Sequence, residues 1–294
     1  TFKNKEPFKG LFTQGMVCHE TYKDQNNQWL NPSDVDSNNG KEFFIKNKPD
    51  EKVLVGPSES MSKSKRNTID PGKMIENYGA DAVRLFILSD SPPEKDVQWS
   101  EQGMVASYKF IQKFWLLHKS IKNKVSTESN VTTKDNELEI HQFVNQLINK
   151  ITKNLENFHY NVIVANFHES YHFLNNMIKK PIGNKILLEN YIKILKIMSP
   201  VIPHITSECL QELDEKTNIS WPEVESKYLE KKNVQIVIQF NGKKRGLINI
   251  NKDITEKEII TKIKLMSIYE KYFNNSEIIK SIYVKERLIN LIVK

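Results

Sequence analysis

The residues best suited to chemistry in this chain form one short stretch, Ser60-Met61-Ser62-Lys63-Ser64-Lys65-Arg66-Asn67. Short hydroxyl side chains alternate there with three cations, and no apolar periodicity runs through it. In such a loop, ammonium groups neutralise phosphate charge, while hydroxyls and backbone N–H groups donate to phosphate oxygens. The stretch therefore favours binding of a polyphosphate. The competing interpretation is a solvated basic turn.

The segments after this stretch keep a definite order of polar residues. Asp70-Pro71 follows Asn67, and then come Tyr78-Gly79-Ala80-Asp81 and Arg84. Met-Ser-Lys-Ser with this sequel resembles the KMSKS signature of class I aminoacyl-tRNA synthetases. Ser60 stands where that signature begins with lysine, although Lys65 and Arg66 are expected to keep the loop cationic. We call the stretch from Ser60 to Asn67 the signature loop.

Further segments narrow the resemblance to the bacterial leucyl family within that class. They are spread along the whole chain and comprise residues 7–17, 89–99, 199–205, Trp221-Pro222 and 241–246. Isoleucyl and valyl families share the loop and are the alternatives within the class. Their members typically end in a cysteine-rich zinc module or a coiled-coil arm, and this sequence contains neither pattern.

The resemblance implies ATP-dependent activation of leucine and transfer of the leucyl group to tRNA(Leu). Lys63 matches the second lysine of the signature and would act as the catalytic residue on the ATP phosphates. Ser60, Met61, Ser62 and Ser64 would complete the ATP-binding set with it. Mg²⁺ is expected with ATP, but no ligands for it are identifiable in this chain, and no metal site is assigned.

Positive charge is concentrated at the C-terminal end. The chain carries a net charge of +7, and residues 234–294 contribute 12 lysines and arginines against 6 acidic residues. A basic module on a nearly neutral body indicates a polyanionic partner such as nucleic acid. Lys243, Lys244 and Arg245 follow an Asn241-Gly242 turn, and the resemblance implies that they contact tRNA. A solvated lysine-rich surface is the alternative.

The elements that must position the signature loop lie in residues 1–98. Strands are expected around 43–45 and 53–55, with Lys/Pro/Asp turns beside them, and helices over 71–78 and 81–88. By resemblance, this region is the C-terminal end of a class I Rossmann-type catalytic domain. The fold class is therefore multidomain and mixed.

Two further domains are expected after it. Apolar residues at helical spacing over 99–223 predict an all-α bundle of four or five helices, similar to an anticodon-binding domain. A polar linker is expected over 122–136 and a charged stretch over 223–233. Alternating strands, the Asn-Gly turn and a Thr255/Glu258 capping box predict a small ββαββ domain over 234–294.

Several polar and aromatic residues are better explained by structure than by chemistry. Asp81 favours a helix N-terminus, and Arg84 lies one turn later on a face that could pair with it. Only four of the 43 basic residues are arginine, so each retained arginine indicates a need for its planar fork. Trp99 and Trp115 are interpreted as core anchors, and His204 as a structural histidine.

The number of cysteines and the hydropathy of the chain limit which cellular compartment it suits and whether it associates with a membrane. Cys18 and Cys209 are too few for a disulfide framework and suit a reducing cytoplasm. Cys18-His19 suggests zinc, but no second Cys/His pair at ligand spacing is nearby, so this interpretation is rejected. No apolar run reaches the length of a membrane span, and no membrane association is expected.

The chain begins at Thr1 within a recognisable pattern, so we expect it to be the C-terminal part of a longer enzyme. The ATP-binding His motif, the editing domain and most of the leucine pocket would lie upstream. The chain is therefore expected to be inactive alone and monomeric when complete. A non-catalytic tRNA-binding module and a subunit of a split synthetase are the alternatives.

Overall fold

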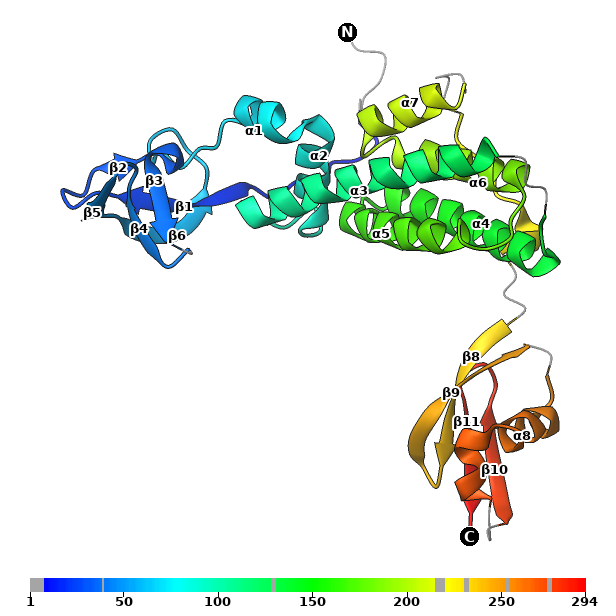
Figure 1. Cartoon of the computed structure of the whole chain (residues 1–294). Coiled ribbons are helices and arrows are strands. Elements are labelled where there is room, and N and C mark those ends of the chain that lie inside the picture. The colour runs from blue at the N-terminus through cyan, green and yellow to red at the C-terminus, as the bar shows by residue number, and fades with distance from the viewer. Residues whose placement is uncertain are drawn as a thin grey trace. The chain divides into compact units, whose positions relative to one another are not determined.

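The computed structural model describes residues 8–38, 40–127, 131–214, 220–229, 233–251, 254–273 and 277–294 (Figure 1). The chain divides into two compact units, Thr1–Val224 and Glu225–Lys294. Parts of the predicted linker and of the charged stretch before residue 234 lie outside the described residues. The expected division of the first unit at residue 98 stays a prediction.

Two small sheets begin the first unit. In one of them, a central strand pairs antiparallel with two strands and parallel with a third. These strands are β1 (Val17–Lys23), β2 (Trp29–Leu30), β6 (Leu54–Ser60) and β7 (Val97–Gln98). The other is an antiparallel meander of β3 (Val35–Asn38), β4 (Glu42–Ile45) and β5 (Lys48–Lys52), preceded by a 3-10 turn over Pro32–Asp34.

The structure corrects two sequence expectations in this region. Strand β5 occupies part of the predicted turn; all five of its residues are exposed at a sheet edge, so no burial pattern marked it. Strand β6 continues past the predicted 53–55 to Ser60, which is therefore a strand residue. Gly56 allows this, because a Cβ there would lie 2.5 Å from the Thr21 hydroxyl oxygen.

Within the described residues, seven α-helices follow. The predicted helices over 71–78 and 81–88 are confirmed to within one residue, and five more lie in the range predicted for the bundle. They are α1 (Pro71–Tyr78), α2 (Ala80–Ser89), α3 (Glu101–Val125), α4 (Lys134–Glu156), α5 (Tyr160–Met177), α6 (Asn184–Met198) and α7 (Pro203–Glu212). Side chains of Asp70, Ser100 and Thr133 cap α1, α3 and α4, satisfying N–H groups that lack a helical partner.

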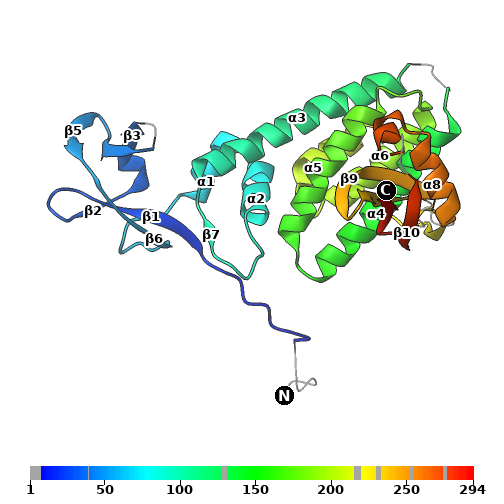
Figure 2. The same cartoon turned by 90° about the horizontal axis from the view of Figure 1, so that it is seen from below.

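The bundle core contains about half of the apolar positions that the helical spacing predicted, and the others are partly buried against it. Phe114, Ile148, Phe167 and Tyr191 are fully buried in it, and Leu85 of α2 joins the same cluster. Helix α3 packs against α2 and along α5 and α6 (Figure 2). Helix α2 is thus joined to the bundle by a continuous hydrophobic core.

The second unit has the predicted ββαββ order. Its strands are β8 (Asn233–Phe240), β9 (Lys243–Asn251), β10 (Ile278–Val284) and β11 (Leu288–Val293), and its helix is α8 (Glu256–Lys264). A 3-10 turn over Ser226–Tyr228 precedes them, and a second over Ser267–Tyr272 follows α8. The sheet order is β10-β11-β8-β9, with β11 parallel to β8.

Local signals in this unit are confirmed individually. Asn241 and Gly242 both have positive φ, 48° and 78°, which matches the tight turn expected of Asn-Gly between antiparallel strands. Thr255 and Glu258 form the full capping box of α8. The inward residues of the sheet and α8, such as Ile238 and Ile259, are fully buried together.

Candidate functional site

The signature loop is fixed at both ends by secondary structure. Ser60 is the last residue of β6 and pairs with Cys18 of β1, and the Met61 N–H donates to the Val17 carbonyl at 3.1 Å. At the other end, Asp70 caps α1 through a 2.9 Å bond from the Gly72 N–H. The exposed middle of the loop therefore stands between a sheet and a helix start.

Short bonds shape the middle of the loop. The Arg66 N–H donates to the Lys63 carbonyl at 3.3 Å, and the Lys65 N–H reaches the Ser62 hydroxyl at 3.4 Å. The Ser62 and Ser64 hydroxyl oxygens lie 3.3 Å apart. Both hydroxyls predicted to bind phosphate oxygens are therefore on the same side of one turn.

The three cations of the loop are in different situations. Lys65 forms an ion pair with Glu59, and Arg66 Nη1 donates to the Trp29 carbonyl at 3.3 Å. The Lys63 side chain is exposed, and its ammonium group makes no hydrogen bond or ion pair within the described part of the chain. The side chains of Lys65 and Arg66 are therefore both engaged by neighbouring groups. Lys63 is the loop cation available to an anion.

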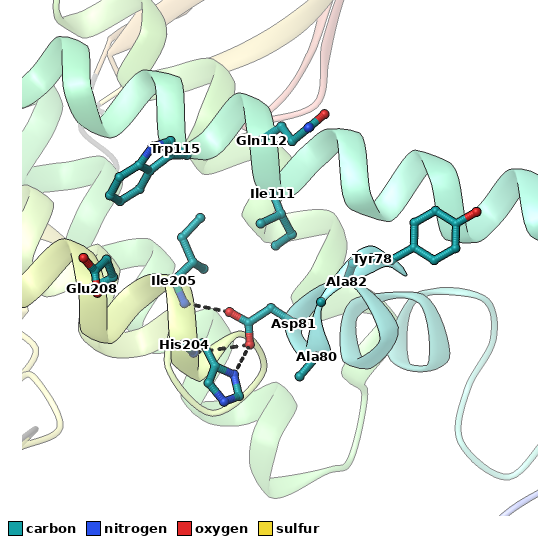
Figure 3. Close-up of a pocket in the computed structure, with 11 residues that line it drawn as sticks. Tyr78, Ala80, Asp81, Ala82, Ile111, Gln112, Trp115, His204, Ile205 and Glu208 are labelled. Atoms are coloured by element: carbon teal, nitrogen blue, oxygen red, sulfur yellow. Dashed lines mark hydrogen bonds and ion pairs between the residues drawn. The ribbon is translucent and has the colours of Figure 1, made fainter. Parts of the chain in front are cut away.

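Asp81 and Arg84 do not pair with each other within the described residues, so that prediction is wrong. The Asp81 carboxylate, 5% exposed, accepts bonds from the Ile205 N–H at 2.7 Å and from the His204 N–H and Nδ1 at 3.2 and 2.9 Å (Figure 3). Arg84 donates from Nε to the Val201 carbonyl at 2.9 Å and from Nη2 to the Pro200 carbonyl at 2.7 Å.

The structural role of these residues is nevertheless confirmed. Asp81 caps the N-terminus of α7 from a different helix, where N–H groups lack helical partners and the helix dipole favours an anion. The fork of Arg84 satisfies two carbonyls of the turn before α7. His204 joins the contact through Nδ1, although its side chain is 72% exposed. We call this set the α2–α7 joint.

An apolar cavity of about 470 Å³ adjoins the joint. Tyr78, Ile111, Trp115 and Ile205 line it, with Glu208 at one side (Figure 3). Trp115 is therefore only partly a core residue, and it stacks on His118 with ring centroids 5.3 Å apart. Trp99 is also half-buried and packs edge-on against Phe86.

A polar cluster extends from the interior of the bundle to its surface. His118 is fully buried, with Nδ1 3.1 Å from the Tyr191 hydroxyl and Nε2 3.2 Å from Glu212 Oε2. Hydrogen bonds from Lys119 and Lys122 lower the pKa of the Glu212 carboxyl to about 2. Burial lowers the pKa of His118, which favours the neutral imidazole. In the sequence, His118 lies at helical spacing with apolar residues such as Phe114 and carries no local signal of these partners, so sequence reasoning missed this cluster.

The second unit presents the predicted basic hairpin, Lys243-Lys244-Arg245, with all three residues exposed. Arg245 lies over the Tyr272 ring at 5.6 Å, and Lys271 lies over the same ring at 5.3 Å. Tyr272 in turn stacks on Phe240, with ring centroids 4.3 Å apart. The basic surface thus includes Lys271, which is distant in sequence and had no local signal.

The remaining site predictions concern metals, thiols and membranes. Cys18 and Cys209 are free and buried. Across the described ranges, no three His, Cys, Asp or Glu side chains are grouped so that they could hold a metal ion. None of the helices in the described residues combines the length and the apolar character needed to cross a membrane.

Comparisons with known proteins agree with this architecture. Residues 52–100 match the family model of class I tRNA synthetases (I, L, M and V), and residues 137–260 match that of the anticodon-binding domain of tRNA ligases. The chain is thus related to the class I tRNA synthetases.

Within that class it is homologous to leucine–tRNA ligases. It is 37% identical to the enzyme of Rickettsia massiliae (strain Mtu5) over 98% of the chain, and 34% identical to that of Wolbachia pipientis subsp. Culex pipiens (strain wPip) over 99%. It spans 34% and 35% of the lengths of these relatives.

A solved structure shares the fold. The crystal structure of the ternary complex of Agrobacterium radiobacter K84 agnB2 LeuRS, tRNA and LeuAMS superposes with a TM-score of 0.63 at 22% identity. The match covers 80% of this chain and 31% of that protein. A class I synthetase fold with mixed sheets and a helical anticodon-binding region is therefore established for this chain.

Proposed function

We propose that this chain forms the part of a leucine–tRNA ligase that supplies the ATP-phosphate loop and tRNA-binding surfaces. The observation that carries the proposal is the state of Lys63, which is exposed and uncommitted on a shaped loop. That loop lies in the segment matched by the class I synthetase model. A protein that only binds tRNA has no need of such a loop.

In the proposed reaction, the leucine carboxylate attacks the α-phosphorus of ATP and pyrophosphate leaves. Negative charge grows on the departing phosphates, and the Lys63 ammonium would stabilise it there. Ser62 and Ser64 would donate their hydroxyl protons to phosphate oxygens, together with nearby backbone N–H groups. Mg²⁺ would enter with ATP as part of the substrate, and no residue of this chain is assigned to it.

The roles of Ser60 and Met61 are more limited in this proposal. Both contribute backbone groups to pairing with β1, which sets where the loop leaves the sheet. Ser60 offers a hydroxyl where the signature has lysine, so Lys63 would act on the phosphates without a second signature lysine. Residues 1–98 are assigned to the end of a Rossmann-type catalytic domain.

The rest of the chain would hold tRNA(Leu). Residues 99–223 are assigned as the anticodon-binding-domain-like bundle and residues 234–294 as the tRNA-contacting domain. The basic hairpin, with Lys271 beside it, supports phosphate contacts that give affinity rather than sequence readout. The complete enzyme is proposed to be a cytoplasmic monomer, consistent with the buried free thiols.

The experiment that tests the proposal places this chain in the Rickettsia massiliae enzyme, in exchange for the segment that it matches. We call the product the joined enzyme. It is expected to catalyse leucine-dependent ATP–pyrophosphate exchange, whereas the chain alone is expected to be inactive. Lys63→Ala should slow exchange by at least about 100-fold while leaving tRNA binding nearly intact.

Lys65→Ala is the matched control, because it removes a cation from the same loop that is already paired with Glu59. It should affect exchange much less than Lys63→Ala. Unchanged exchange in Lys63→Ala would show that the assigned role is wrong. If the joined enzyme catalyses ATP–pyrophosphate exchange only after a separate copy of the chain is added, the result would instead favour a subunit of a split synthetase.

A further inference from the structure

Asn67, at the end of the signature loop, is the most deeply buried polar residue of the loop region. Its side chain is 0% exposed, whereas Lys63, Ser64 and Arg66 are exposed. A buried carboxamide is costly unless both of its ends are hydrogen-bonded. The contacts of Asn67 show where those bonds go.

The Asn67 carboxamide connects three backbone segments. Its Oδ1 accepts from the Ser62 N–H at 2.8 Å, at the start of the loop turn. Its Nδ2 donates to the His19 carbonyl of β1 at 3.3 Å and to the Glu59 carbonyl of β6 at 3.2 Å. The partners fix the orientation of the amide, because an N–H needs the oxygen and two carbonyls need the NH₂ group.

These bonds close the loop on the sheet around Lys63. Ser62 and Asn67 are joined on either side of the turn sealed by the bond from the Arg66 N–H to the Lys63 carbonyl. The remaining ties, Lys65 to Glu59 and Arg66 to Trp29, are made by solvent-exposed side chains. Such exposed ties contribute little, so the buried amide is the main side-chain tie between the turn and the sheet.

We infer that Asn67 is a positioning residue, which acts on ATP through Lys63 by holding the loop turn in one conformation. The inference rests on the proposed function of Lys63. Preorganisation of a charged group is effective because a displacement of about 1 Å can cost about 100-fold in rate. Without Asn67, the Ser62 N–H and two strand carbonyls lose this partner, and the side-chain ties that remain between the turn and the sheet are the exposed ones of Lys65 and Arg66.

The test is a double-mutant cycle in the joined enzyme, using Asn67→Ser and Lys63→Ala. Alone, Asn67→Ser should lower kcat for ATP–pyrophosphate exchange by about 10- to 100-fold, with a smaller change in KM for ATP. In the Lys63→Ala background it should cause no further loss, because the group that it positions is gone. A structural role alone would give the same loss in both backgrounds.

Asn190→Ser is the matched control. Asn190 is also 0% exposed, but it lies on α6 and donates to the Ile186 carbonyl at 2.8 Å within that helix. Its substitution should lower stability without changing exchange below the unfolding temperature. If Asn67→Ser does not fold, Asn67→Asp keeps the side-chain size and the acceptor for Ser62 but removes both donors, and the same non-additive loss is expected.

Hydrogen exchange of the 294-residue chain gives a second, independent measurement. The Ser62 amide should exchange much more slowly than the Ser64 amide, since Asn67 accepts its proton. Equal exchange at the two amides, full activity in folded Asn67→Ser, or additive losses with Lys63→Ala would each overturn the inference. If Lys63→Ala leaves ATP–pyrophosphate exchange unchanged, the proposed function of Lys63 is wrong. That result can be told apart from a failure of the inference about Asn67.

Discussion

The signature loop and the α2–α7 joint stand on either side of α1 and use the same kinds of residue in opposite ways. In the loop, the Lys63 side chain is exposed, and its ammonium group has no hydrogen bond or ion pair within the described residues. In the joint, the Asp81 carboxylate is buried and accepts bonds from His204 and Ile205. A charged residue in a motif is therefore available for chemistry only where the fold leaves its charge unmatched.

Asp81→Ala should produce the largest stability effect and test the structural side of this comparison. Two N–H groups of α7 would lose their acceptor, including the buried Ile205 N–H, at a cost of about 2–3 kcal/mol in the free energy of unfolding. Urea denaturation should show a lower midpoint with an unchanged slope.

Asp81→Asn is the matched control for this prediction. It keeps an oxygen acceptor toward α7 but removes the negative charge that favours the helix N-terminus, so the loss should be smaller. If Asp81→Ala and wild type unfold at the same urea concentration, the joint contributes no measurable stability. The bonds of buried Asp81 would then be no evidence that the fold uses this charge for stability.

Arg84→Ala should have the next largest effect, about 1 kcal/mol, because the Pro200 and Val201 carbonyls lose a shared donor. The side chain is partly solvent-exposed, so water replaces some of these bonds. Arg84→Lys should recover only part of the loss, since an ammonium cannot present two donors as a planar fork. Equal stability of the lysine variant and wild type would contradict the importance of the fork.

Local signals allowed much of this fold to be predicted from the sequence. The Asn241-Gly242 turn and the Thr255/Glu258 capping box act within a few residues, and the structure confirms both. The joint escaped prediction because Asp81 and Arg84 contact residues more than 100 positions away. Before folding, the nearest opposite charge to Asp81 was Arg84, which made a local pair the natural prediction.

The loop shows the same division between local and distant information. Lys63 was identified from the type and order of its neighbours, but the engagement of Arg66 with the Trp29 carbonyl depends on a strand 37 residues earlier. Asn67 was identified as part of a motif without a role. Its two carbonyl partners come from β1 and β6, so its function as an anchor is visible only after the sheet has formed.

Acid should weaken the cluster of half-buried Glu212 with Lys119, Lys122 and buried His118, a second region in which charges are matched. The folded pKa of Glu212 is about 2, below its ordinary value of 4.5. Its stabilising contribution is therefore present above about pH 4.5 and is lost as the pH falls toward 2. Buried His118, with its lowered pKa, adds a decline that begins as the pH falls below about 6.5.

Urea midpoints measured at several pH values would check this sign. Glu212→Gln should lower stability at neutral pH and flatten the decline between about pH 4.5 and 2. Glu189→Gln, which alters an exposed carboxylate on α6 near Lys185, is the matched control and should leave the profile unchanged. If the urea midpoint of Glu212→Gln falls between about pH 4.5 and 2 as steeply as that of the wild type, this cluster does not respond to acid as proposed.

The basic hairpin should show the smallest stability effect, because it resembles the loop rather than the joint. Replacing Lys243, Lys244 and Arg245 by glutamine should change the free energy of unfolding by no more than about 0.5 kcal/mol, apart from the loss of the Arg245 contact with Tyr272. The effect should instead be seen in the salt dependence of tRNA binding.

Each phosphate contact removed should reduce the slope of log affinity against log salt by about 1. Glutamine at Lys280 and Lys294, also in the second unit but outside the hairpin, provides a charge-matched comparison for two of the three substitutions. If the slope of log affinity against log salt falls only in the hairpin variant, the hairpin cations contact tRNA phosphates and, like Lys63, are available to an anion. Equal losses in both variants would mean that tRNA senses the net charge of the unit rather than this surface.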